Sequence, residues 1–226
     1  MSHNVHPYAF RLGFNRDWKS RWFGGVRQYR KNLKVDVLIR EWLIKKLRGS
    51  YVSAIETERS PDMFKIIIKT SRPGIIIGRG GEGIEKLRKQ VLAQMHRLKL
   101  ELPRELKISI EEALSPESHA AILAMMMAED LERRLPFRRV LKRTIEKAAA
   151  NKNVKGVKIK LSGRLDGAEM GRVEWLMRGR IPLQTLRSDI DFARERAHLP
   201  YGHIGIKVWI YKGEIFEHVV SKESKT

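Results

Sequence analysis

The feature that most constrains the fold is a glycine-rich stretch from Pro73 to Leu87, reading Pro-Gly-Ile-Ile-Ile-Gly-Arg-Gly-Gly-Glu-Gly-Ile-Glu-Lys-Leu. An apolar run, Ile75 to Ile77, has the character of buried chain and leads into glycines that carry one cation, Arg79. Glycine adopts positive φ at little cost and allows another backbone to approach closely. An amphipathic helical pattern begins at Glu82, and the N-terminus of a helix presents N–H groups that suit an anion. The stretch therefore predicts a phosphate-binding loop.

The elements around this loop decide which kind of phosphate site it is. Gly78, Gly80 and Gly83 satisfy the dinucleotide pattern G-x-G-x-x-G, but that site needs a βαβ unit and an acidic residue about 20 residues further on. Here the glycines follow a predicted hairpin, and residues 96–99 at that distance are basic, so a dinucleotide site is excluded. The expected order is a helix from Asp36 as N-cap to a stop at Gly49, strands over 51–59 and 63–70 joined by a turn at 60–62, a short helix, the loop, a helix over 82–98, and a strand over 106–110.

The charge of the chain indicates its class of partner. Its 46 Lys and Arg residues against 26 Asp and Glu give a formal net charge of +20. An excess of this size favours nucleic acid, because neutralising phosphates releases counterions. The sequence contains no apolar run of 18 residues, so no membrane partner is expected. Cysteine is absent, which excludes disulfides, thiolate metal sites and thiol catalysis and fits the cytoplasm or an organelle matrix.

Residues 1–35 interleave aromatic and basic side chains without a helical or strand period. Aromatic faces can stack on bases and guanidinium groups can reach phosphates, so this segment is predicted to be an arm lying on structured RNA. The alternative is an extension that packs its aromatic residues on its own domain. The basic residues proposed to contact RNA in this segment are Arg11, Arg16, Lys19 and Arg21.

The second half of the chain predicts a separate domain. Residues 112–118 change charge sign and contain Ser115-Pro116, which is typical of a linker. Two helices, over about 117–135 and from Pro136 to about Asn151, precede strands over about 156–161, 173–181, 188–197 and 204–211. The predicted fold is α+β in two domains. The divisions are an arm (1–35), a first domain (36–111), a linker (112–118), a two-helix domain with a mixed or antiparallel sheet (119–219), and a polar tail (220–226).

The helix after Pro136 begins with the densest group of cations in the chain, with seven basic residues between 133 and 147. Several lie one turn apart, and each such like-charge pair destabilises a helix by roughly 0.2–0.5 kcal/mol. A solvated face normally mixes both signs, so a face that follows phosphates is favoured over a merely solvated one.

No catalytic site is supported by the sequence. Asp189 and Asp191 could face the same way on a strand and hold Mg²⁺ for phosphodiester chemistry, but Arg187, Arg194 and Arg196 flank them as ion-pair partners. The histidines form no metal-binding motif. We therefore predict no enzyme activity, no metal and no cofactor.

The element order around Gly78-Arg79-Gly80-Gly81 resembles the prokaryotic-type KH domain, whose Gly-x-x-Gly loop holds a nucleic-acid backbone. Several motifs together resemble the small-subunit ribosomal protein number three family, in its bacterial or organellar form. They are Val5-His6-Pro7, Arg11-Leu12-Gly13, Arg72 to Gly78, Leu131 to Arg134, Phe137-Arg138-Arg139, Ser162 to Leu165, Gly167-Ala168-Glu169 and Gly205 to Ile210.

This resemblance implies a structural constituent of the small-subunit head that binds rRNA beside the head proteins numbered ten and fourteen. It also implies a position at the entrance to the mRNA channel, where Arg138, Arg139 and Lys142 would aid unwinding of structured mRNA. Further rRNA contacts are assigned to Arg143, Arg164, Arg172 and Arg178. The chain departs from the family at Gly80, where a second cation is usual. A free-standing KH RNA chaperone or translation regulator remains the alternative, and a Mg²⁺-dependent nuclease a remote one.

Overall fold

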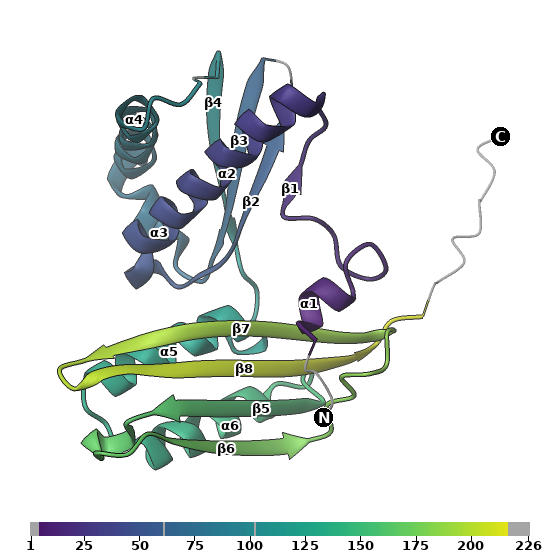
Figure 1. Cartoon of the computed structure of the whole chain (residues 1–226), viewed down its shortest axis with the longest axis vertical. Helices are drawn as coiled ribbons and strands as arrows, with labels where there is room; N and C mark the ends of the chain where they lie inside the picture. The colour runs from purple at the N-terminus through teal and green to yellow at the C-terminus, as the bar shows by residue number, and fades with distance from the viewer. Residues whose placement is uncertain (1–4, 61, 102, 217–226) are drawn as a thin grey trace.

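The chain folds into two α+β units, shown in a computed structural model that describes residues 5–60, 62–101 and 103–216 (Figure 1). The predicted tail over 220–226, and Pro61 in the predicted turn, lie outside the described residues. The first unit contains a four-stranded sheet in the order β1-β2-β3-β4, and the second a four-stranded sheet in the order β6-β5-β8-β7.

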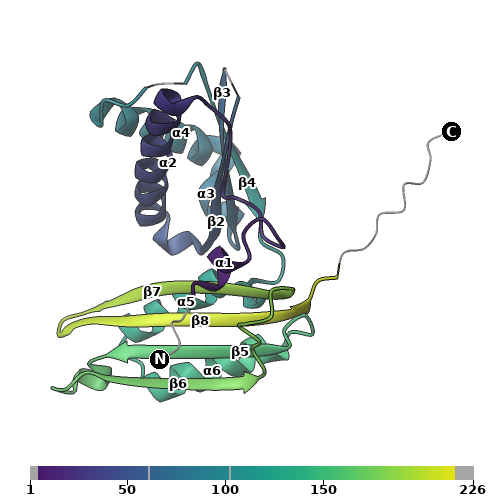
Figure 2. The same ribbon diagram turned by 45° about the vertical axis from the view of Figure 1, so that its right-hand side comes forward.

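The first unit has the element order predicted around the glycine loop. It comprises α2 (Val26–Lys46), β2 (Val52–Arg59), β3 (Met63–Thr70), α3 (Pro73–Ile77), the 3₁₀ turn Arg79–Gly81, α4 (Glu82–Arg97) and β4 (Glu105–Glu112). Strand β3 pairs antiparallel with β2 and parallel with β4. Helices α2 and α4 lie on the same side of this sheet, as Figure 2 shows. Their buried apolar residues form one core with alternate residues of β2 and β3, including Ile66 and Ile68.

The predicted helix start at Asp36 is wrong, because α2 begins ten residues earlier at Val26 and the predicted arm boundary falls within it. Asp36 is 1% exposed and is surrounded by donors rather than capping a helix end. Its carboxylate accepts from Trp22 Nε1 and Thr57 Oγ1, each at 2.7 Å, and pairs with Arg59 Nη2 at 2.8 Å. The sequence analysis began the helix too late because residues 26–34 are mostly polar, and the apolar side chains that recur there at helical spacing, Val26, Tyr29 and Leu33, are exposed rather than part of the core.

The segment before α2 is not an arm free of secondary structure. It forms the short helix α1 (Pro7–Phe10) and the strand β1 (Ser20–Arg21), which pairs in parallel with β2. The alternative interpretation, packing on the chain's own domains, therefore holds for part of it. Trp22 bonds Asp36, whereas Phe23 is 98% exposed. Ile75 also departs from the prediction, since it is 61% exposed on α3 rather than buried.

The second unit is a sheet covered on one face by two helices. Its elements are α5 (Ala120–Glu132), α6 (Phe137–Ala150), β5 (Gly156–Gly163), β6 (Arg172–Gly179), β7 (Ser188–Leu199) and β8 (Gly202–Glu214). All pairings in this sheet are antiparallel. Both helices lie behind the sheet in Figure 1. Val157, Ile159 and Leu161 alternate along β5 as predicted, and they form the core with the buried faces of α5 and α6.

Side chains on α5 join the two units. Glu129 accepts a hydrogen bond from the hydroxyl of Tyr51, and Glu132 pairs with Arg48 at 2.5 Å. Tyr51 also packs with Ala113 and Ile122 in a small buried cluster. The predicted linker is thus short and partly ordered, with the 3₁₀ turn Pro116–Ser118 leading into α5.

Candidate nucleic-acid interface

The glycine loop is built by three left-handed glycines between two helices. Gly78, Gly80 and Gly81 have φ of 70°, 60° and 82°, a region that side chains rarely adopt. Gly83, in the first turn of α4, has a different role. A Cβ atom there would lie 2.3 Å from the carbonyl oxygen of Ile76, so only glycine allows α4 to begin this close to α3.

Charge at this loop is modest. Arg79 is exposed between the glycines, but α4 carries Glu82 and Glu85 in its first turn, and Lys86 pairs with Glu82 at 2.9 Å. These acidic side chains already interact favourably with the partial positive charge at the N-terminus of α4. What the loop offers to a polynucleotide is therefore an exposed backbone free of Cβ atoms together with one guanidinium group.

Helix α6 presents the cationic face predicted from the sequence. Its buried side holds Phe137, Val140, Leu141, Thr144, Ile145 and Ala148, while the exposed side holds the cationic face, Arg138, Arg139, Lys142 and Arg143. These four side chains and Glu146 line a shallow hollow. The first turn contains no acidic residue. Cations at a helix N-terminus oppose the macrodipole, and like charges one turn apart repel, so the helix tolerates this face at a cost that a bound anion would remove.

The structure extends this face onto β6. Glu174 lies between two predicted contact residues, 3.8 Å from Arg138 and 3.3 Å from Arg172. The guanidinium groups of Arg138 and Arg172 also lie 5.7 Å and 5.3 Å from the centre of the Phe137 ring. Arg172 is therefore brought to the cationic face, while Arg178 lies six residues away along the exposed strand β6.

The other predicted contact residues are not grouped with this face. Arg21 is engaged by Asp17, Glu56 and Glu58, and Arg16 pairs with Asp189. The side chain of Arg164 donates to the carbonyl oxygen of Ala168 at 2.9 Å. Lys19 is exposed, with its ammonium group 5.1 Å from the Tyr8 ring.

Arg11 corrects a prediction, because its side chain is 0% exposed and has no surface to offer rRNA. Nε donates to the carbonyl of Ser188 at 2.6 Å, and Nη1 to that of Pro7 at 3.1 Å. Nη2 donates to the carbonyls of Leu183 at 2.9 Å and Thr185 at 2.8 Å. Burial is the largest cause that lowers the pKa of Arg11 from its usual value, and nearby Arg16 adds to it. The residue anchors the N-terminal segment to the second unit.

The pair Asp189 and Asp191 does not form a metal site. The pairing of β7 with β8 has a register shift between Asp189 and Ile190, and each of the two carboxylates has its own partner. Asp189 pairs with Arg16, and Asp191 accepts from the backbone N–H of Ala120 at 2.8 Å, where α5 begins. Within residues 5–60, 62–101 and 103–216, no group of three His, Asp or Glu side chains is placed to hold a metal ion. The helices of the same residues include none long and apolar enough to cross a membrane.

The structure has one further cationic surface that was not predicted from the sequence. Lys158 and Lys160 alternate with the buried apolar residues of β5 and lie on the face away from the helices, beside Trp209 and Lys207 of β8. The signal that could have found them is the same period of two that predicted the buried Val157, Ile159 and Leu161.

Two family descriptions match the chain: "KH domain" over residues 38–117 and "Ribosomal protein S3, C-terminal domain" over residues 127–210. A relative from Caldicellulosiruptor bescii named "Small ribosomal subunit protein uS3" is 43% identical over 100% of this chain and 98% of its own length. A relative from Pyropia yezoensis, "Small ribosomal subunit protein uS3c", is 41% identical over 99% of this chain and 95% of its own length. One from Solibacter usitatus is 45% identical over 96% of this chain, which spans 60% of that longer relative.

Proposed function

Because the chain belongs to the uS3 family of small ribosomal subunit proteins, we propose that it is a structural part of the small subunit and binds rRNA through its KH domain. The names of the relatives describe a structural ribosomal protein, which agrees with the prediction that the chain is not an enzyme. The KH domain itself implies RNA binding. Neighbours in the assembly would include the head proteins numbered ten and fourteen.

The cationic face of α6 is proposed to lie at the entrance to the mRNA channel and to aid unwinding of structured mRNA. The observation that supports this role is the exposure of Arg138, Arg139 and Lys142 on two successive turns, where only Glu146 is acidic among the residues lining the hollow. Such a face follows the phosphates of a single strand as it is pulled past. Strand re-pairing is then disfavoured without a nucleotide-hydrolysing site.

The glycine loop is proposed to anchor rRNA, chiefly through backbone approach. Gly78, Gly80 and Gly81 expose the main chain, and Arg79 supplies the one cation between them. The weaker charge of this loop, compared with α6, suggests that shape contributes more than electrostatics to its contact.

The test replaces Arg138, Arg139 and Lys142 together by Ala in ribosomes that carry this chain. Translation of a message with a stable hairpin should fall more than translation of a matched unstructured message. In a control variant, the exposed residues Lys34, Lys45 and Lys46 of α2 are replaced by Ala, which removes the same number of positive charges. Equal loss on both messages, or an equal loss in the control, would contradict the unwinding role.

A high-salt wash distinguishes whether the chain is a structural component of the small subunit or a free-standing KH regulator. Small subunits are collected after a high-salt wash and the chain is quantified in the pellet. An integral component stays with the subunit, whereas a protein held only by exposed charges is removed, because salt weakens phosphate contacts steeply. Loss in the wash would overturn the structural assignment.

A further inference from the structure

The face of the second sheet that points away from α5 and α6 carries ordered rows of aromatic and basic side chains. Strand pairing aligns its side chains in rows that cross all four strands in the order β6, β5, β8, β7. The aromatic row is Met177, Lys158, Trp209 and Phe192, the cationic row is Trp175, Lys160, Lys207 and Arg194, and the third row is Val173, Ser162, Gly205 and Arg196. None of these twelve residues is acidic.

The cationic row is unfavourable without an anion. Lys160 is directly opposite Lys207, and Lys207 is directly opposite Arg194. Neighbouring strands lie about 4.8 Å apart, and like charges directly opposite each other destabilise a sheet. Among the described residues, no carboxylate forms an ion pair with any of these three cations. The sheet thus keeps three adjacent positive charges on one line.

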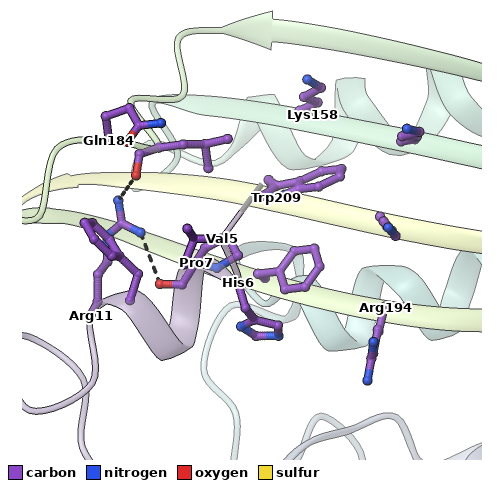
Figure 3. A pocket seen from close by; sticks show the side chains of 13 residues that line it. Val5, His6, Pro7, Arg11, Lys158, Gln184, Arg194 and Trp209 are labelled. Carbon is purple, nitrogen blue, oxygen red and sulfur yellow. Dashed lines mark hydrogen bonds between the residues drawn. The ribbon is translucent and has the colours of Figure 1, made fainter. Parts of the chain in front are cut away.

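Aromatic rings accompany these charges. Trp175 is 56% exposed on the edge strand, and Lys158 Nζ lies 5.0 Å from its ring centre and 5.7 Å from that of Trp209. Trp209 and Phe192 lie 5.2 Å apart, and His6 meets the edge of Phe192 at 4.8 Å. Figure 3 shows Trp209 beside Val5 and His6 in the hollow where the N-terminal segment meets the sheet.

We propose that this open face binds a single-stranded segment of RNA, with a base against the exposed ring of Trp175 and phosphates along the cationic row. A four-stranded sheet with two helices behind it and aromatic residues on its free face is the means by which RNA-recognition-motif domains stack bases. Stacking tolerates any base, and lysine and arginine beside the rings neutralise the backbone. The surface is distinct from the cationic face of α6, which lies on the helix-covered side of the sheet.

An acidic polypeptide is the competing occupant. It would match the cations, but it gives no reason for Trp175 to remain exposed on the edge of the row. The interleaving of rings and cations favours a ligand that carries flat bases and charged phosphates in alternation. The two occupants predict different results when Trp175 is changed.

The test measures binding of the full chain to fluorescein-labelled oligo(U) by anisotropy. It uses the chain with Arg138, Arg139 and Lys142 replaced by Ala, so that the sheet face is not masked by α6. In that background, Trp175→Ala should weaken binding about tenfold, the loss of one stacked base, with an unchanged salt slope. Trp175→Phe should restore most of the affinity. Because Trp175 is largely exposed, thermal unfolding should match the parent.

Replacing Lys160 and Lys207 together should instead reduce the slope of log K against log salt by about 1.4, since each phosphate contact on a single strand contributes about 0.7. The matched control is Lys45→Ala with Lys46→Ala, which should leave the slope unchanged. Oligo(U) containing 4-thiouridine should cross-link to peptides of β5, β6 or β8.

Three results would overturn the proposal. The first is binding within twofold of the parent after Trp175→Ala, and the second is cross-linking confined to the KH loop or α6. The third is displacement of oligo(U) by poly-glutamate together with no effect of Trp175→Ala, which would assign the face to an acidic polypeptide. None of these results bears on the hairpin translation test, so a failure here leaves the proposed role of α6 standing.

Discussion

The Nε atom of Arg11 donates a hydrogen bond to the backbone carbonyl of Ser188 over 2.6 Å, although 177 residues separate the two in the sequence. This bond begins a set in which one buried guanidinium satisfies carbonyls from Pro7 and from residues 183–188. The N-terminal segment is therefore held to the second unit before it adds β1 to the first. The Arg11 side chain thus fixes the start of the chain to the second unit, and β1, further along the chain, joins the first sheet.

Replacing Arg11 by Ala should destabilise the protein by about 3 kcal/mol or more, because several buried carbonyls lose a charged donor at once. The measurement is urea unfolding followed by circular dichroism. Arg11→Lys should recover only part of the loss, since one ammonium group cannot reproduce the planar fork. The control is Arg27→Ala on the exposed start of α2, expected within about 0.5 kcal/mol of the parent. Similar loss in both variants would show that Arg11 is not the anchor.

Replacing Asp36 by Ala should cost about 3–5 kcal/mol, because the guanidinium of Arg59 would be left without its partner in a mostly buried site. The hydroxyl of Thr57 and the indole N–H of Trp22 would lose their acceptor as well. Glu41→Ala is the matched control, an exposed acid on the same helix. The double variant Asp36→Ala with Arg59→Met tests the reason, since removing both charges should recover stability. Failure to recover any would mean that the pair itself is not the cause.

Patterns confined to one element were predictable from the sequence. Strand β3 has the predicted bounds of Met63–Thr70, and α6 begins at Phe137 with its cations exposed. In both β3 and α6, the spacing of the apolar residues indicates which face of the element packs against the core. The order of elements around the glycine loop could be predicted for the same reason.

Roles that depend on distant partners could not be predicted. Asp36 has the residue type of an N-cap, and only the approach of Arg59 and Trp22 makes it a buried hub. Arg11 belongs to a cationic segment that suited RNA, yet carbonyls 171 or more residues away enclose it. The open sheet face needs the registers of four strands before Lys160, Lys207 and Arg194 fall in one row. No local window of sequence contains that information.

Replacing Gly83 by Ala should destabilise the first unit, by about 1–3 kcal/mol, because the new Cβ would lie 2.3 Å from the carbonyl oxygen of Ile76 and 2.8 Å from that of Ile77. In this case an intrinsically better helix former is harmful. Gly49→Ala is the control, since no atom lies within 4 Å of a Cβ there. Thermal unfolding compares the two. A Gly83→Ala variant at least as stable as the parent would show that α3 can move away from α4 at no cost.

The contact between the two units should weaken in mild acid through His119. Ser53 Oγ and His119 Nδ1 lie 3.2 Å apart, joining β2 to the start of α5. Burial is the largest cause that lowers the pKa of His119 below its usual 6.5, and Lys212 adds to it while Asp191 opposes it. The folded protein therefore binds this proton less readily than the unfolded chain. The stabilisation that neutral His119 contributes is therefore complete above about pH 6.5, the usual pKa of histidine in an unfolded chain. It is lost as the pH falls toward the lower pKa that His119 has in the folded protein.

The unfolding temperature should accordingly fall between pH 7.5 and 5.5 by more in the parent than in His119→Gln, which carries no titrating ring. His96→Gln, at an exposed position on α4, should leave the parent's pH dependence intact. Protonated His119 would face Lys212 and Arg16 with only Asp191 as a counter-charge, so the loss reflects both burial and repulsion. An equal fall in the parent and in His119→Gln would place the acid sensitivity elsewhere. A smaller fall in His96→Gln would mean that the exposed histidines carry part of it.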